Sequence, residues 1–113
     1  INPMLADGQR HGGLAQGVGQ AMWEQVIYDD DGNLVTSSFM DYLIPTAASL
    51  PLFDLDRTVT PTPTNPLGAK GIGEAGAIGS TPAVVNALAD ALGGADVQIP
   101  VTPEQIWRAL RNR

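Results

Sequence analysis

The residues best suited to chemistry lie in a glycine-rich stretch at residues 68–80, GAKGIGEAGAIGS. One carboxylate, Glu74, and one amine, Lys70, stand among five glycines. Glycine lets a backbone approach another group closely, at an entropic cost that an ordinary connector has no reason to bear. A carboxylate near apolar neighbours such as Ile72 and Ile78 can act as a general base. We therefore predict that Glu74 is catalytic; the structural alternative is a flexible connector whose glutamate favours a helix N-terminus.

A second group of polar residues recurs at helical spacing before this stretch. Apolar residues at spacings of three and four predict an amphipathic helix over residues 13–26, with an inward face of Leu14, Val18, Ala21 and Met22. The opposite face carries Gly13, Gln16, Gly17, Gln20 and Glu24. A glycine inside a helix costs about 1 kcal/mol relative to alanine. We therefore expect either a second helix or a ligand to approach this face closely, and the spacing does not choose between them.

Two common site motifs are excluded by their context. Residues 71–76 match GxGxxG, but the dinucleotide fingerprint requires a buried strand before it, and here three prolines precede it. No GK[ST] is present, so the chain lacks a phosphate-binding P-loop. The single histidine, His11, is expected to be structural or exposed, and with no cysteine the sequence predicts no metal ligands among the side chains.

Composition limits the class of protein further. The chain has 113 residues, 43% of them hydrophobic, which suffices for one small domain that buries about two thirds of its unfolded surface. A net charge of −6 argues against a nucleic-acid partner. No apolar run reaches the roughly 18 residues of a membrane span, and the lack of cysteine favours the cytoplasm.

The elements that must position these residues predict an α+β fold. After an extended lead-in over residues 2–11 and the helix over 13–26, two β-rich runs at 26–28 and 34–40 flank an Asp-Gly turn and predict a β-hairpin. A calcium loop fails at this turn, because its sixth position is Leu34 rather than glycine. Prolines make residues 42–66 a stiff extended strap with at most one short strand, near residues 53–59.

Two C-terminal helices complete the expected fold, packed on one side. The first follows the glycine-rich loop, with Ser80 or Thr81 as its cap and Pro82 at its first position, and it ends at Gly93. The second opens with a capping box at residues 102–105 and is expected to turn Ile106, Trp107 and Leu110 inward.

Four stretches carry a resemblance to a known family. They are HGGLAQGVGQAMWEQ at residues 11–25, YDDDGNLVTSSFMDYLIPTA at 28–47, TPTNPLGAKGIGEAG at 62–76 and PVTPEQIWRAL at 100–110. In this order they resemble the C-terminal end of the molybdenum-binding large subunit of the xanthine oxidase family, with the nearest likeness to aerobic carbon monoxide dehydrogenases. The resemblance implies that residues 1–113 are a single C-terminal fragment of a molybdopterin-binding domain, inactive when isolated.

The resemblance also implies roles for the residues singled out above. The family's GxGE motif places its catalytic glutamate at Glu74, which would act as the base in a hydroxylation. Its QGxG motif falls on residues 16–19, which makes Gln16 a cofactor contact and Gly17 the residue that permits the approach. The backbone of Lys70, Gly71 and Gly73 matches the cofactor-facing loop.

The implied activity is that of a molybdenum oxidoreductase that oxidises a small molecule with water-derived oxygen. Its cofactor would be a molybdopterin-type molybdenum cofactor, and the resemblance leaves open both a cytosine dinucleotide form and an additional copper ion. The implied partners are the rest of the large subunit and flavin and iron–sulfur subunits or domains, in an oligomer. The competing hypothesis is a small non-catalytic interaction module whose glycine faces pack against a protein.

Overall fold

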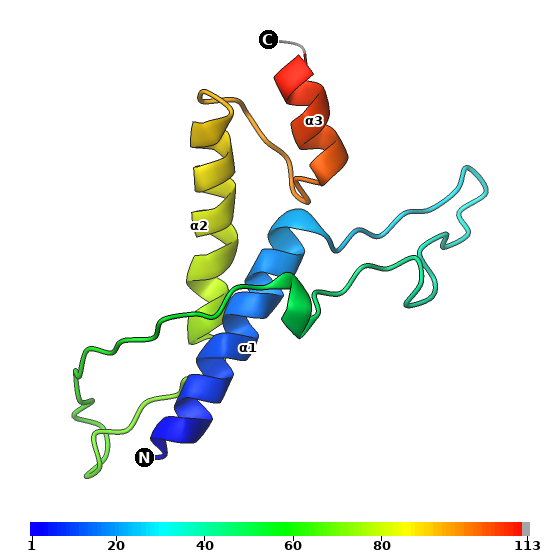
Figure 1. Cartoon of the computed structure of the whole chain (residues 1–113). Coiled ribbons are helices and arrows are strands. Elements are labelled where there is room, and N and C mark those ends of the chain that lie inside the picture. Colours follow the sequence, from blue (N-terminus) through cyan, green and yellow to red (C-terminus); the bar gives the residue numbers. More distant parts are fainter. Residues whose placement is uncertain (112–113) are drawn as a thin grey trace.

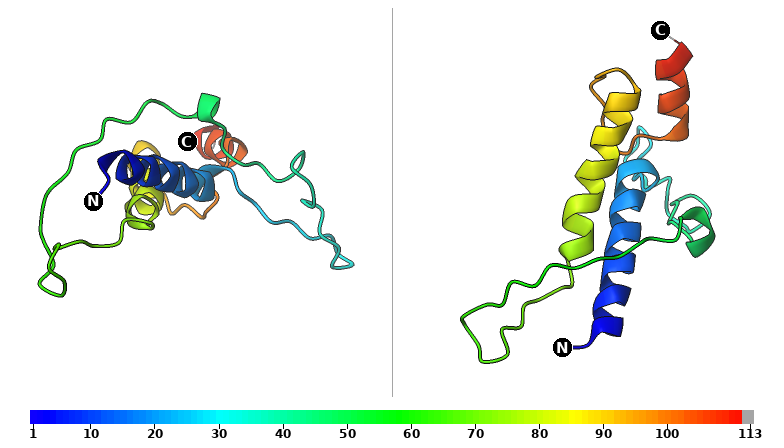
Figure 2. Two further views of the ribbon diagram at one scale, coloured as in Figure 1. Left: turned by 90° about the horizontal axis from the view of Figure 1, so that it is seen from below. Right: turned by 60° about the vertical axis from the view of Figure 1, so that its left-hand side comes forward.

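The computed structural model describes residues 1–111, which form three α-helices joined by long irregular segments (Figure 1). Helix α1 spans Pro3–Met22, α2 spans Ala75–Ala91 and α3 spans Pro103–Arg111, and a short 3₁₀ turn lies at Ala47–Ser49. Figure 1 and the right-hand view of Figure 2 show α2 beside α1, while α3 stands beyond the C-terminal end of α1. Among the described residues, α1 and α2 alone form an extensive helix pair.

Helix α1 begins ten residues earlier than its apolar pattern predicts. Asn2 caps it by accepting a hydrogen bond of 3.1 Å from the Leu5 amide, and Pro3 occupies the first turn. This combination starts a helix strongly, because proline has no amide to leave unpaired there. The expected extended lead-in over residues 2–11 is therefore wrong. The helix ends at Met22, where the amides of Trp23 and Glu24 both donate to the Gly19 carbonyl.

Helices α1 and α2 touch through their glycines. A Cβ on Gly13 would lie 2.8 Å from the Cα of Gly76, so no side chain fits there. Four residues further along each helix, Gly17 lies against buried Ser80, whose hydroxyl is 3.5 Å from the Gly13 carbonyl. Because both contacts advance by four residues in the same sense, the helices run parallel. Of the two partners expected for the glycine face, the second helix is the one observed at Gly13 and Gly17.

Helix α2 also begins earlier than expected, at Ala75 instead of Pro82. The first two turns use residues assigned to the loop, and Pro82 lies in the helix interior. A proline there cannot donate to the carbonyl four residues back, which usually ends a helix. Packing of Gly76 and Ser80 against α1 compensates for that loss. The true loop is therefore short and ends at Glu74, directly before the helix.

The predicted β-hairpin is absent. Residues 26–44 leave the helices as an arm whose only ladder contact is an isolated bridge between Tyr28 and Leu34. The turn itself does form, since the Asp29 carboxylate accepts hydrogen bonds from the amides of Asp31 and Asn33. A two-stranded ribbon without a third strand or a helix to pack on is marginally stable. The α+β class is therefore wrong for residues 1–111, which are helical with no β-strand.

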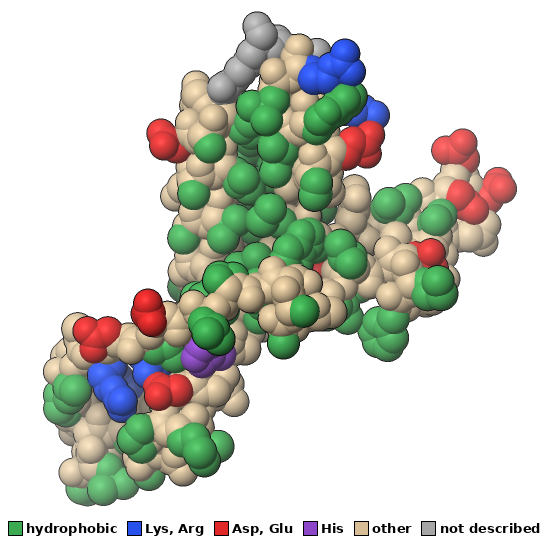
Figure 3. Space-filling view, viewed as in Figure 1, with side chains coloured by type: hydrophobic (Ala, Val, Ile, Leu, Met, Phe, Trp, Pro, Cys, Tyr) green, Lys and Arg blue, Asp and Glu red, His purple; other side chains and the backbone are tan. Residues whose placement is uncertain are grey.

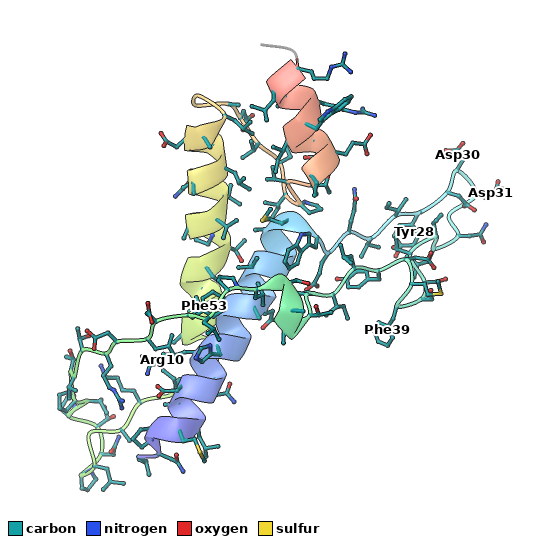
Figure 4. The ribbon with its side chains drawn as sticks, in the orientation of Figure 1. Arg10, Tyr28, Asp30, Asp31, Phe39 and Phe53 are labelled. Atoms are coloured by element: carbon teal, nitrogen blue, oxygen red, sulfur yellow. The ribbon has the colours of Figure 1, made fainter. Side chains whose placement is uncertain are left out.

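The proline-rich strap is extended, as expected, but contains no strand near residues 53–59. It passes across α1, where the Arg10 guanidinium donates to the Asp56 carbonyl at 2.6 Å. The rings of His11 and Phe53 meet with their centroids 5.8 Å apart, and Figure 4 shows Phe53 and Arg10 beside α1. These contacts attach the strap to the N-terminal half of α1.

Helix α3 begins as the capping box predicts, with the Gln105 amide donating to the Thr102 hydroxyl at 3.3 Å. The segment before it is anchored by the buried Val101, whose amide donates to the Ala21 carbonyl at 2.7 Å. Of the expected inward face, Ile106 is half-buried by the described residues, but Trp107 is 56% exposed and Leu110 is 53% exposed. The prediction that both C-terminal helices pack on one side is therefore wrong for α3.

The described chain has almost no core of its own. Its buried hydrophobic residues are Ala21, Leu92 and Val101, while many large apolar side chains are exposed on the helices and the arm (Figure 3). The accessible surface is 8482 Å², against about 5,900 Å² for a compact protein of this mass. The radius of gyration is 17.7 Å, where a compact chain of this length has about 13 Å. The composition suffices for one small domain, but residues 1–111 do not fold into a compact one, and about 2,500 Å² more surface is accessible than in a compact protein of this mass.

Candidate functional site

Glu74 stands directly before the first turn of α2. Its backbone is near-helical, with φ −105° and ψ −3°, and its side chain makes no capping hydrogen bond. It lines an open hollow of about 390 Å³ together with Gly71, Gly73, Ala75 and Ile78. The carboxylate is exposed to this hollow and is not used by the chain's own secondary structure.

Gly71 and Gly73 are not explained by the chain's own geometry. Neither has a positive φ, and a Cβ built on either meets nothing within 4 Å. Gly68 differs, because its φ is +64° and a Cβ would lie 2.7 Å from Pro61. The turn therefore explains Gly68, whereas Gly71 and Gly73 leave free space beside Glu74 for a group from outside the chain.

Gln16 lines a second hollow, of about 300 Å³, on the adjoining side of the helix pair. Its other lining residues are Gly17, Gln20, Glu24, Tyr42 and Ala77. Gln16 and Gln20 are one turn apart on α1, so they share one face of the helix, and Glu24 lies just beyond its C-terminal end. The hollow is therefore lined by two amides, a carboxylate and a phenol, which are hydrogen-bonding groups.

The phenol and the carboxylate are bonded to each other. The Tyr42 hydroxyl donates to Glu24 Oε2 at 2.7 Å, and this hydrogen bond raises the pKa of Tyr42 above its ordinary value. Glu24 also approaches Gly19, at the end of α1. The pair therefore fastens the base of the returning arm to α1 at the edge of the hollow.

Thr81 contacts α1 across the helix pair. Its Oγ1 lies 3.2 Å from the carbonyl oxygen of Gly17 and 2.9 Å from Oε1 of Gln20. Ala77 lines the hollow beside Gln16, while Ala75 and Ile78 line the hollow beside Glu74. Both hollows therefore border the first turn of α2.

The helix crossing also limits the separation of Gln16 and Glu74. Gly13 and Gly76 are in backbone contact, Gln16 is one turn beyond Gly13, and Glu74 is two residues before Gly76. With the spacing of residues in a helix, the Cα atoms of Gln16 and Glu74 lie within about 15 Å of each other. Both side chains are exposed, so a group of cofactor size can reach the two from outside the chain.

The remaining sequence candidates occupy different places. Gly17 lies against Ser80, and its backbone also lines the hollow beside Gln16. Lys70 is exposed at the start of the glycine loop. Sequence reasoning considered Thr81 only as a helix cap, because α2 was expected to begin after it. The helical spacing between Glu74 and Thr81 would have indicated a role for Thr81 if the helix had been predicted to begin earlier.

Known proteins that are similar to this chain identify its family. A family model described as a molybdopterin cofactor-binding domain matches residues 1–51. The carbon monoxide dehydrogenase large chain of Hydrogenophaga pseudoflava is 42% identical over 98% of this chain and 14% of its own length. The nicotine 6-hydroxylase large subunit of Paenarthrobacter nicotinovorans is 43% identical over 98% of this chain and 14% of its own length. A crystal structure of a Cu,Mo-CO dehydrogenase superposes with a TM-score of 0.91 at 41% identity, over 99% of this chain and 14% of that one.

The chain therefore belongs to the family of molybdenum-binding large subunits that includes carbon monoxide dehydrogenase and xanthine dehydrogenase, as a segment of such a subunit. It spans about 14% of the length of the curated relatives it matches. Its open shape is that of the same segment inside a much longer chain, which accounts for the small core. Among the described residues, no helix is long and apolar enough to cross a membrane.

Proposed function

We propose that this chain forms one wall of the molybdenum-cofactor site in a hydroxylase-type oxidoreductase that oxidises a small molecule with water-derived oxygen. The observation that carries the proposal is the glycine crossing of α1 and α2. It holds the Cα atoms of Gln16 and Glu74 within about 15 Å, beside hollows that both border the first turn of α2. Membership in the family supports this function over a non-catalytic interaction module.

The residues present suit such a cofactor. Gly71 and Gly73 leave space next to Glu74 that no atom of the chain fills. The Gln16 amide offers both a donor and an acceptor, as a polar heterocyclic cofactor requires. Backbone groups of Lys70, Gly71 and Gly73 would bind along the loop. When bound, the cofactor supplies the two-electron redox chemistry, which no side chain of this segment can provide.

The chain's own residues contribute a base, a contact and a scaffold. Glu74 would accept, on a carboxylate oxygen, the proton of the water-derived nucleophile, since its carboxylate is not engaged in capping α2. Gln16 would orient the cofactor through its amide. The backbone contact between Gly13 and Gly76 fixes the spacing of these two side chains.

The partners follow from the exposed surface. About 2,500 Å² more surface is accessible than in a compact chain of this mass, which is in the range of obligate interfaces. We propose that the rest of the large subunit covers the exposed face of α3 and the arm, which includes Trp107 and Phe39. The proposal extends to flavin and iron–sulfur partners and to an oligomer in the cytoplasm.

The test uses the complete parent subunit. Glu74→Gln removes the base while keeping the size of the side chain, so turnover is expected to fall about 100-fold or more with molybdenum content unchanged. Glu104→Gln on α3 is the matched control, because Glu104 is exposed and pairs with Arg108 on the surface. Turnover of the Glu74→Gln enzyme equal to that of the control would exclude Glu74 as the base.

A further inference from the structure

The hollow beside Gln16 contains a second amide whose orientation is determined by its neighbours. Thr81 Oγ1 is within hydrogen-bond distance of two oxygens, at 3.2 Å for Gly17 O and 2.9 Å for Gln20 Oε1. A hydroxyl has one proton and can donate to only one of them at a time. The two oxygens as placed therefore compete for a single donor.

Both contacts are satisfied at once if the Gln20 amide is turned over. The Thr81 hydroxyl then donates to the Gly17 carbonyl, and Gln20 Nε2 donates to Thr81 Oγ1. The oxygen and nitrogen of a glutamine amide are distinguished only by their hydrogen bonds, so this orientation is the one that the network selects. It leaves the Gln20 carbonyl oxygen without a hydrogen bond to Thr81, in a side chain that lines the hollow.

We propose that Gln20, oriented by Thr81, is a second amide contact for the bound cofactor, presenting its carbonyl oxygen to an N–H donor of the pterin. This inference depends on the proposed function. Gln16 and Gln20 lie one helical turn apart on α1 and line the same hollow. With the Glu24 carboxylate beside them, the lining is rich in acceptors, which suits the amino and ring N–H groups of a pterin. Thr81 is the positioning residue, because it acts through Gln20.

Cofactor retention by the complete parent subunit tests the assignment. Gln20→Leu keeps the volume and removes the amide, so the rate of cofactor loss during dialysis is expected to rise about ten-fold, as for one lost hydrogen bond. Bound molybdenum and pterin per subunit are measured over time. Gln105→Leu is the matched control, since Gln105 is an exposed glutamine on α3, away from the helix crossing.

Thr81 provides the second comparison, in case the leucine variant folds poorly. Thr81→Val removes the hydroxyl, so it should raise the rate of cofactor loss several-fold, and Thr81→Ser should restore it. The proposal is overturned if Gln20→Leu retains the cofactor as well as Gln105→Leu does, or if the valine and serine variants behave alike. Either result leaves the Glu74→Gln measurement unaffected, so the two proposals fail independently.

Discussion

The backbone contact between α1 and α2 makes a strong prediction for Gly76. In Gly76→Ala, the new Cβ would lie 2.7 Å from the Arg10 carbonyl oxygen, 2.8 Å from the Leu14 amide nitrogen and 2.9 Å from the Gly13 Cα. All three are backbone atoms of α1, so no flexible side chain can move aside. The helices must therefore move apart by up to about 1 Å to restore van der Waals contact.

The size of the effect follows from this displacement. Overpacking a tight contact costs about 1–3 kcal/mol, while alanine regains up to about 1 kcal/mol of helix propensity. With the full gain in helix propensity, a net loss of up to about 2 kcal/mol is therefore expected. Separation of the helices also moves Gln16 away from Glu74, and a shift of about 1 Å at a catalytic site can lower the rate roughly 100-fold.

Melting temperature, molybdenum content and turnover of the complete parent subunit measure these effects. Gly8→Ala is the control, because Gly8 lies in the same α1 and a Cβ there meets nothing within 4 Å. The control should gain up to about 1 kcal/mol of stability, so the two variants are expected to differ in sign. If Gly76→Ala were as stable and as active as Gly8→Ala, the crossing would not be what fixes the distance between Gln16 and Glu74.

Two further predictions concern hydrogen bonds outside the proposed catalytic residues. The raised pKa of Tyr42 means that its bond to Glu24 contributes stability below pH 10, which is lost as the pH rises through the folded-state pKa. Tyr42→Phe should remove this loss in alkaline denaturation curves, and an unchanged curve would refute the assignment. The Asn33 hydrogen bonds lower the pKa of Asp29, so the turn loses that stabilisation as the pH falls through the lowered value. Asn33→Ala should raise the Asp29 pKa, as measured in an NMR titration. Asn33→Asp keeps a side-chain acceptor but lacks the donor, so it should not restore the lowered pKa of Asp29.

The sequence was informative where a local pattern had one physical meaning. Leu14, Val18 and Ala21 predicted the inward face of α1, and all three are at least half-buried. The glycine at position 17 predicted close approach of another element, and the contact with Ser80 confirmed it. The capping box at Thr102 predicted the start of α3.

The errors arose where a local signal competed with tertiary packing. Asp7-Gly8 suggested a turn, but the cap at Asn2 extends α1 through both residues. Pro82 suggested a helix start, but contact with α1 stabilises two earlier turns of α2. The β-rich runs around Asp29 formed a turn with one isolated bridge, because among residues 1–111 there is no further strand for them to pair with.

The sequence by itself determined the chemistry: a carboxylate among glycines at Glu74, an amide on a glycine helix face at Gln16, and the family to which both motifs belong. Tertiary structure alone decided that these groups lie within about 15 Å of each other, because the backbone contact joins Gly13 to Gly76, 63 positions further along the chain. It also showed that the chain does not enclose a core. The physical reason is that the hydrophobic effect favours burial of an apolar side chain but does not specify which surface buries it, and here that surface lies outside this segment.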